Sequence, residues 1–101
     1  MGMSSTKRIV IDTPTAEAIA IKALAFIAAD DTLLPRFLAL TGLEPAQLRI
    51  AAAEPGFLPG VLDFVLGHEP TLQQFCVAED IAPAHVPAAL EALAGDNRLA
   101  E

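Results

Sequence analysis

The sequence is poor in the residues that most often carry chemistry or membrane insertion. It has no Trp or Tyr and a single cysteine, Cys76. One cysteine excludes an intramolecular disulfide and any metal site built on several thiolates. Lys22 interrupts the longest apolar stretch, so no run approaches the roughly 18 residues of a membrane span. Asp12 and Pro14 end a short apolar run too early for a secretory signal. These absences predict a cytoplasmic protein.

Positive charge is missing from half of the chain. The net charge is −7, yet residues 1–49 contain five basic and five acidic side chains. Residues 50–97 contain seven acidic side chains and no Lys or Arg. The second half therefore has to present an acidic surface. Such a surface repels phosphate backbones, so the sequence predicts no nucleic-acid binding.

What is abundant is apolar and favours helices. Hydrophobic residues make up 53% of the 101 residues, and the aromatic ones are five Phe. A chain of this length forms one domain. Alanine, leucine and glutamate are frequent, and all three are good helix formers. We expect residues 1–12 to be a mobile leader, and residues 13–101 to form a single helical domain with an aliphatic core and the five Phe as its large side chains.

Most of the eight prolines stand where a first helical turn accepts them. The first helix is predicted from a cap at Thr13 or Thr15 to about residue 29. A second helix follows residues 30–32, which can cap it, with Leu34, Phe37, Leu38 and Leu40 inward and Gly42 at its end. Four more helices open at Pro45, Pro55, Pro70 and Pro83. The fourth reaches Gly67, and the sixth ends at residues 95–97, with Pro87 delaying its start or tightening its first turn.

A repeat at an interval of 38 residues suggests an architecture. Residues 24–48 align with residues 62–86, and the identical positions are Leu24, Phe26, Leu34, Phe37, Pro45 and Ala46 with Leu62, Phe64, Leu72, Phe75, Pro83 and Ala84. One copy could not cover its own apolar face, whereas two packed copies could. The fold class is therefore all-α, with about six short helices in a compact orthogonal bundle of two three-helix units. Independent recurrence of the same helix and turn pattern is the alternative.

No set of residues has the spacing of a catalytic or cofactor site. Cys76 lies on an apolar helix face and is interpreted as a small buried hydrophobe. His68 and His85 are interpreted as surface residues; a metal site would need them to converge with Glu69 or Asp80. Because no nucleophile–base pair, phosphate loop or metal-ligand spacing is present, we expect no enzyme, no cofactor and no metal.

Acidic pairs at helix ends have two interpretations. Asp31 suits a helix N-terminus, where the helix dipole favours a negative charge. Glu79 and Asp80 stand close to a helix C-terminus, where the dipole is unfavourable. They either cap the following helix or attract a cationic partner.

Apolar residues outside the main helix faces point to a surface for partners. Ile21 falls between Glu17 and Lys22, and Leu33 and Ile50 are also expected outside the core. They either cover a loop or form a groove or dimer patch. The predicted interaction surface consists of Ile21, Leu33, Ile50, Asp63, Glu69, Glu79 and Asp80.

The leading hypothesis is a non-enzymatic helical protein–protein interaction module. Its acidic second half would face a basic protein partner, and the chain would form a homodimer. The alternative is a binder of a small apolar or cationic ligand between the two helical units.

Three runs carry a family resemblance: ALAFIAAD at residues 23–30, RFLALTGL at 36–43 and FLPGVLDF at 57–64. Together they resemble a bacterial family of unknown function, with members of about this length known mainly from alphaproteobacterial genomes. The resemblance covers residues 15–95, and FLALTG is its most specific part. It implies a bacterial, cytoplasmic origin and supplies no activity or site residues.

Overall fold

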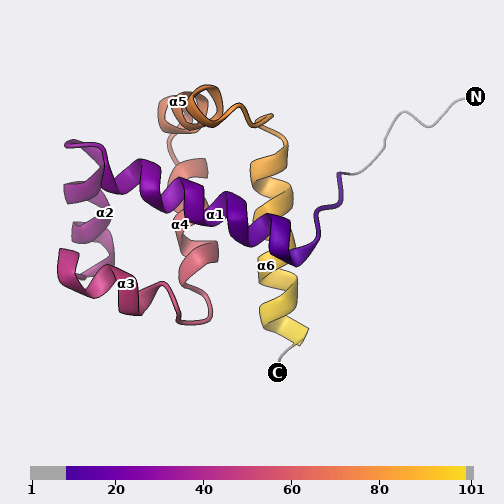
Figure 1. Ribbon diagram of the computed structural model, residues 1–101, viewed down its shortest axis with the longest axis horizontal. Coiled ribbons are helices and arrows are strands. Elements are labelled where there is room, and N and C mark those ends of the chain that lie inside the picture. The colour runs from indigo at the N-terminus through magenta and orange to yellow at the C-terminus, as the bar shows by residue number, and fades with distance from the viewer. Residues whose placement is uncertain (1–8, 100–101) are drawn as a thin grey trace, which may run out of the picture.

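The chain folds into helices throughout the part that the structure describes. The computed structural model describes the backbone of residues 9–99 and the side chains of residues 9–95 (Figure 1). This range contains six α-helices and no strand, which confirms the all-α prediction. The elements are α1 (Thr13–Ala28), α2 (Leu33–Thr41), the 3₁₀ turn η1 (Pro45–Gln47), α3 (Leu48–Ala51), α4 (Phe57–Leu66), α5 (Glu69–Glu79) and α6 (His85–Leu99).

Helices α1, α4 and α6 form the centre of the domain. Each of the three contacts the other two, and α1 runs across α4 and α6 (Figure 1). The buried residues of this centre are Ala16, Ile19, Ala20, Ala23 and Ile27 of α1, Val61, Leu62 and Val65 of α4, and Val86, Ala89 and Leu93 of α6. Several of them are alanines, and small side chains at a contact let helix axes approach closely. The core is therefore aliphatic, as the composition predicts.

Phenylalanine rings attach the outer helices α2 and α5 to this centre. Phe37 of α2 packs edge-to-face on Phe57 and Phe64 of α4, with ring centroids 5.9 and 5.3 Å away. Phe26 of α1 and Phe75 of α5 make a third such pair at 5.6 Å. Phe37 and Phe75 are buried, and the other three are partly buried against the core. The predicted use of all five Phe as large core side chains is confirmed.

The helix ends show which local signals are reliable. Asp12 caps α1, because its carboxylate accepts a hydrogen bond from the Thr15 N–H at 3.2 Å. The predicted caps at Thr13 or Thr15 are wrong, since both residues lie inside the helix. Within the predicted cap region 30–32, Thr32 takes the N-cap position of α2 without a side-chain cap bond, and the Asp30 carboxylate accepts hydrogen bonds from the N–H groups of residues 32 and 33 at 2.8 and 2.9 Å. Gly42 ends α2 in the left-handed conformation at φ 76°, as predicted.

The inward face of α2 differs from the prediction. Leu33 was expected at the surface but is 5% exposed, whereas Leu40 was expected inside but is 74% exposed. The turn capped by Asp30 brings α2 back against α1, so that its first residue already lies at the contact. Leu33 and Phe37 are one turn apart and form the buried face. The last turn of α2, with Leu40, leaves its side chains open to solvent.

The final helix starts late and continues past its predicted end. It begins at His85, two residues after Pro83, so that Pro87 lies in its first turn, as expected. It continues to residue 99, and the predicted end at residues 95–97 is wrong. Gly95 stays helical, because a glycine inside a helix costs only about 1 kcal/mol relative to alanine and does not by itself end one.

The 38-residue repeat is not confirmed. The third element of the first unit is the short η1–α3 segment, whereas its counterpart is the 15-residue helix α6 at the centre of the domain. Of the predicted leader, residues 1–8 lie outside the described residues. Residues 9–12 precede α1, and Ile11 packs against the core.

None of the helices in the described part of the chain has the length and apolar character needed to cross a membrane.

Candidate functional site

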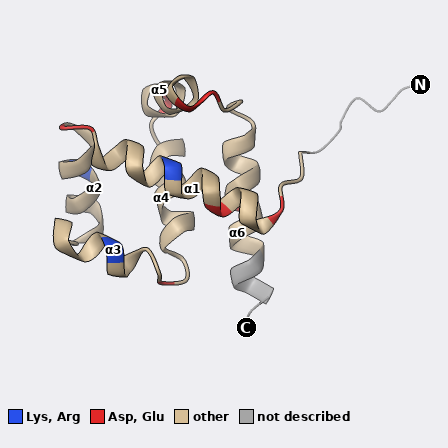
Figure 2. Cartoon of the chain, in the orientation of Figure 1, with Lys and Arg blue, Asp and Glu red and all other residues tan. Residues whose placement is uncertain are grey.

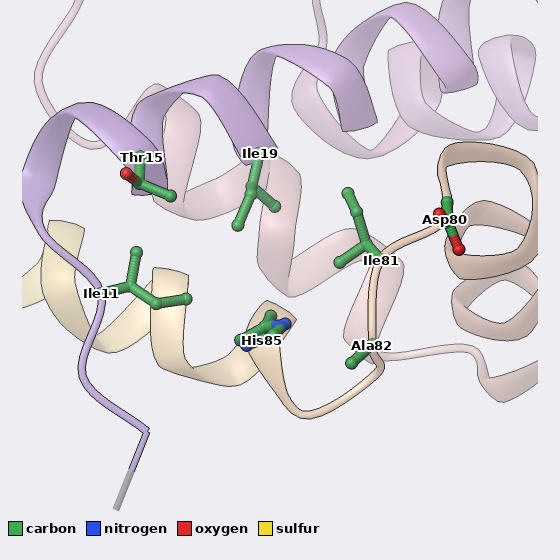
Figure 3. A pocket seen from close by; sticks show the side chains of 7 residues that line it. All are labelled: Ile11, Thr15, Ile19, Asp80, Ile81, Ala82 and His85. Atoms are coloured by element: carbon green, nitrogen blue, oxygen red, sulfur yellow. The ribbon is translucent and has the colours of Figure 1, made fainter.

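A groove of about 570 Å³ opens between the start of α1, the connection from α5 to α6, and the start of α6 (Figure 3). Its lining consists of Ile11, Thr15, Ile19, Asp80, Ile81, Ala82 and His85. The two ends of this set are some 70 residues apart in the chain, so only the packing of α1 on α6 brings them together. The groove is the candidate site.

The walls of the groove are mainly apolar. Thr15 and Ile19 are one turn apart on α1 and therefore share a face. Ile11 extends this face from the segment before the helix, and Ile81 points toward it from the opposite side (Figure 3). Ile19 is only 8% exposed, and Ile11 and Ile81 are partly buried against the core. An apolar side chain of a ligand would therefore meet three isoleucines here.

Backbone geometry places Asp80 at the rim. Asp80 ends α5 in the left-handed conformation, with φ 55° and ψ 48°, and is the only non-glycine residue of the described chain with a positive φ. The next N–H, of Ile81, donates to the carbonyl of Cys76 at 3.0 Å, which closes the helix end. This reversal turns Ile81 into the groove and leaves the Asp80 carboxylate exposed beside it (Figure 3).

The Asp80 carboxylate does not cap α6. It forms no hydrogen bond or ion pair with the rest of the described chain, and neither does that of Glu79. The first amides of α6 instead donate to backbone carbonyls, from His85 to Ala82 at 2.9 Å and from Val86 to Pro83 at 3.1 Å. Capping, one of the two interpretations of this acidic pair, is therefore wrong. The other, attraction of a cationic partner, stays open.

The two histidines stand at the starts of two different helices. His85 is the first residue of α6 and lines the groove, partly buried. His68 precedes α5, and its Nδ1 lies 2.8 Å from the hydroxyl of Thr71, which is 2% exposed. That contact gives the buried hydroxyl a partner. Among the described side chains, no three His, Cys, Asp or Glu gather closely enough to hold a metal ion.

Cys76 is 5% exposed, as predicted for a small hydrophobe in the core. Burial raises the pKa of its thiol. Since the thiolate is the reactive form, this environment makes Cys76 a poor nucleophile at neutral pH.

The predicted interaction residues are distributed over several elements. Ile21 and Ile50 are exposed, at 55% and 72%, whereas Leu33 is buried, and its assignment to the surface is wrong. The acidic members of the set, Asp63, Glu69 and Asp80, are exposed, and Glu79 is partly buried. Only Asp80 lines the groove.

Charge divides along the fold as it does along the sequence. The described cations Lys22, Arg36 and Arg49 lie on α1, α2 and α3, where Figure 2 shows the blue segments. From α4 to residue 95, the charged side chains are all acidic. The groove has one wall on the start of α1 and the other on this acidic part.

The comparisons with known proteins give a family but no activity. A family model described as "Protein of unknown function (DUF3572)" matches residues 13–96, so the chain belongs to this family. The predicted membership of a family of unknown function is thereby confirmed. No curated protein and no solved structure matches the chain.

Proposed function

We propose that this member of the DUF3572 family is a non-enzymatic helical interaction module that binds a basic segment of another protein. The groove receives an apolar side chain of that segment, and Asp80 pairs with a neighbouring Lys or Arg. The observation that carries this proposal is the carboxylate of Asp80, which stands without a partner at the rim of an isoleucine-lined groove.

The chemistry of the groove sets the kind of ligand. Burying one Leu- or Phe-sized side chain is worth about 1.5–3 kcal/mol. An exposed ion pair adds about 1 kcal/mol or less. The sum corresponds to millimolar affinity, so a useful complex needs further contacts around the groove. The acidic surface from α4 to residue 95 favours basic partners in these contacts and accelerates their association.

Selection from a random-peptide library tests the proposal directly. The immobilised protein should enrich peptides in which Leu, Ile or Phe stands beside Lys or Arg. In a titration of the ¹⁵N-labelled protein, a selected peptide should shift the amide signals of Ile11, Ile19 and Ile81 more than those of α2.

Two matched substitutions show whether the carboxylate contributes. Asp80→Asn removes the charge and keeps a side chain that tolerates the left-handed backbone, so it should weaken peptide binding about fivefold, as the loss of about 1 kcal/mol requires. Asp31→Asn, between α1 and α2, removes an exposed carboxylate that lies neither in the groove nor on the acidic part from α4 onward, and it should leave the affinity unchanged. Equal affinities for the two variants, or selected peptides without basic residues, would refute the proposal.

The same groove supports a second candidate, a small apolar ligand carrying a cation. Its volume of about 570 Å³ lies within the usual range for small-molecule sites. A thermal-shift screen of alkyl and aryl amines distinguishes the two. A rise in melting temperature that Asp80→Asn abolishes, with no peptide selected, would favour the small ligand.

A further inference from the structure

The outer face of α1 is apolar although nothing in the described chain covers it. Every residue of this face is exposed: Pro14, Ala18, Ile21, Ala25 and Ala28. The inner face of the same helix forms part of the core, so α1 is apolar on both sides. A helix that is hydrophobic all round normally has both faces buried. In Figure 1, α1 lies in front of α4 and α6.

The spacing of this face is that of a coiled-coil seam. The intervals from residue 14 to residue 28 are four, three, four and three, so the five residues alternate between the d and a positions of a heptad. The charged neighbours take the flanking positions, because Glu17 precedes the a position Ala18 and Lys22 follows the d position Ile21. Glu17 is therefore at g and Lys22 at e.

The two flanking charges decide which partner and which direction fit. They lie on opposite sides of the seam, and neither forms an ion pair within the described chain. In a parallel dimer the g side of one helix faces the e side of the other, so that Glu17 of each copy meets Lys22 of its partner. In an antiparallel dimer like sides face each other, so the side that carries Glu17 meets the same side of the partner, and no Glu17–Lys22 pair forms.

We propose that two copies of this chain associate through the outer faces of α1, parallel and in register, with Glu17 and Lys22 forming two symmetry-related ion pairs. The two Ile21 side chains pack against each other at the twofold axis, and the alanines let the helices approach closely. Of the groove residues on α1, Ile19 takes a b position outside the seam, whereas Thr15 takes an e position at its edge. The dimer therefore leaves accessible the part of the groove formed by Ile19, Asp80 and Ile81.

The dimensions predict a weak dimer. The 16 residues of α1 span about 24 Å, and only Ile21 contributes a large side chain to the seam. Such a contact is smaller than the roughly 800 Å² per partner of a stable interface. We therefore expect association at protein concentrations above roughly 0.1 mM, the range of weak transient contacts.

Cysteine crosslinking tests the direction. Each residue of a parallel in-register seam faces its own copy, so Ala18→Cys and Ala25→Cys, each combined with Cys76→Ala, should both form disulfide-linked dimers on mild oxidation. An antiparallel pair permits crosslinking only at residues close to its twofold axis. Ala39→Cys, at an exposed position of α2, is the matched control and should stay largely monomeric. Crosslinking at only one seam position, or equally at residue 39, would overturn the proposal.

Sedimentation equilibrium tests the energetics. Ile21→Asp should abolish the dimer, whereas Ile50→Asp, at another exposed isoleucine, should not. Glu17→Lys and Lys22→Glu should each weaken dimerisation about fivefold, because both ion pairs become repulsive, and the double exchange should restore it. A monomeric wild type at all concentrations, or no recovery in the double variant, would refute the parallel dimer. Circular dichroism confirms that each variant is folded.

Dimerisation through α1 and peptide binding in the groove can be tested independently. Ile21→Asp should leave the binding of a selected basic peptide unchanged, and Asp80→Asn should leave dimerisation unchanged.

Discussion

Phe37 is the side chain whose removal should show how the outer helix α2 is held. It is 2% exposed and lies between two rings of α4, Phe57 and Phe64, at centroid distances of 5.9 and 5.3 Å. Phe37→Ala removes both contacts and leaves a cavity between α2 and α4. Phe37→Leu keeps most of the aliphatic volume and removes mainly the contacts between rings.

The size of each effect follows from these contacts. Truncation of a buried Phe to Ala costs about 3–5 kcal/mol. An edge-to-face pair contributes about 0.5–1.5 kcal/mol beyond area burial, so the two pairs predict a loss of about 1–3 kcal/mol for Phe37→Leu. A domain of this size has about 5–15 kcal/mol of stability in total. Phe37→Ala should therefore remove a large part of it.

Chemical denaturation followed by far-UV circular dichroism measures both losses, since the chain has no Trp or Tyr for fluorescence. Leu40→Ala, on the same helix and 74% exposed, is the control and should change stability by less than about 0.5 kcal/mol. Equal losses for Phe37→Ala and Leu40→Ala would show that α2 is held by another face.

Three further predictions concern local features. Gly42→Ala should lower the free energy of unfolding by about 1–2 kcal/mol. The loss comes from the left-handed backbone alone, since a Cβ there meets nothing within 4 Å. Gly60→Ala, inside α4 and equally uncrowded, should instead raise the free energy of unfolding in the same denaturation assay. Cys76 should react with a thiol reagent far more slowly in the folded protein than in denaturant, because burial raises the pKa of its thiol, and equal rates would contradict this. Hydrogen bonding from the side chain of Thr15, and after it from the Thr15 N–H, lowers the pKa of Asp12. The charged cap therefore stabilises the fold above the unfolded pKa near 4. The melting temperature of the wild type should exceed that of Asp12→Asn there, and this difference should vanish as the pH falls through the lowered pKa of the folded state. A difference in melting temperature that does not change with pH would argue against the cap.

Helix number and several helix ends could be predicted from the sequence because local signals determine them. Asp30, Gly42 and the late start of α6 all follow from the chemistry of a single turn. The cap of α1 was assigned to the wrong residue because Asp12, Thr13 and Thr15 are all capable of capping. Only the position of the first packed turn on the core distinguishes them.

The faces of short helices could not be predicted as well. The nine residues of α2 include six apolar side chains in nearly every direction, so their periodicity fits more than one face. Which one is buried depends on the turn that folds α2 back on α1, and that is a tertiary property. For this reason Leu33 is buried and Leu40 is exposed, the reverse of the prediction.

The groove could not be predicted from sequence patterns either, because tertiary packing forms it. It joins Ile11, in a segment predicted to be mobile, to residues 80–85. The sequence gives no sign that Asp80 adopts the left-handed conformation, which glycine or asparagine more often takes. Of the groove residues, only Asp80 was predicted to take part in interaction, from its charge.

The phenylalanine contacts have a consequence for how the native state opens. One ring cluster joins α2 to α4 and a separate pair joins α1 to α5, so the two outer helices are attached at different points. Either can detach while α1, α4 and α6 keep their mutual contacts. Amide hydrogens of α2 and α5 should therefore exchange with solvent through two independent partial openings, each requiring less free energy than the global unfolding that exposes the amides of the centre.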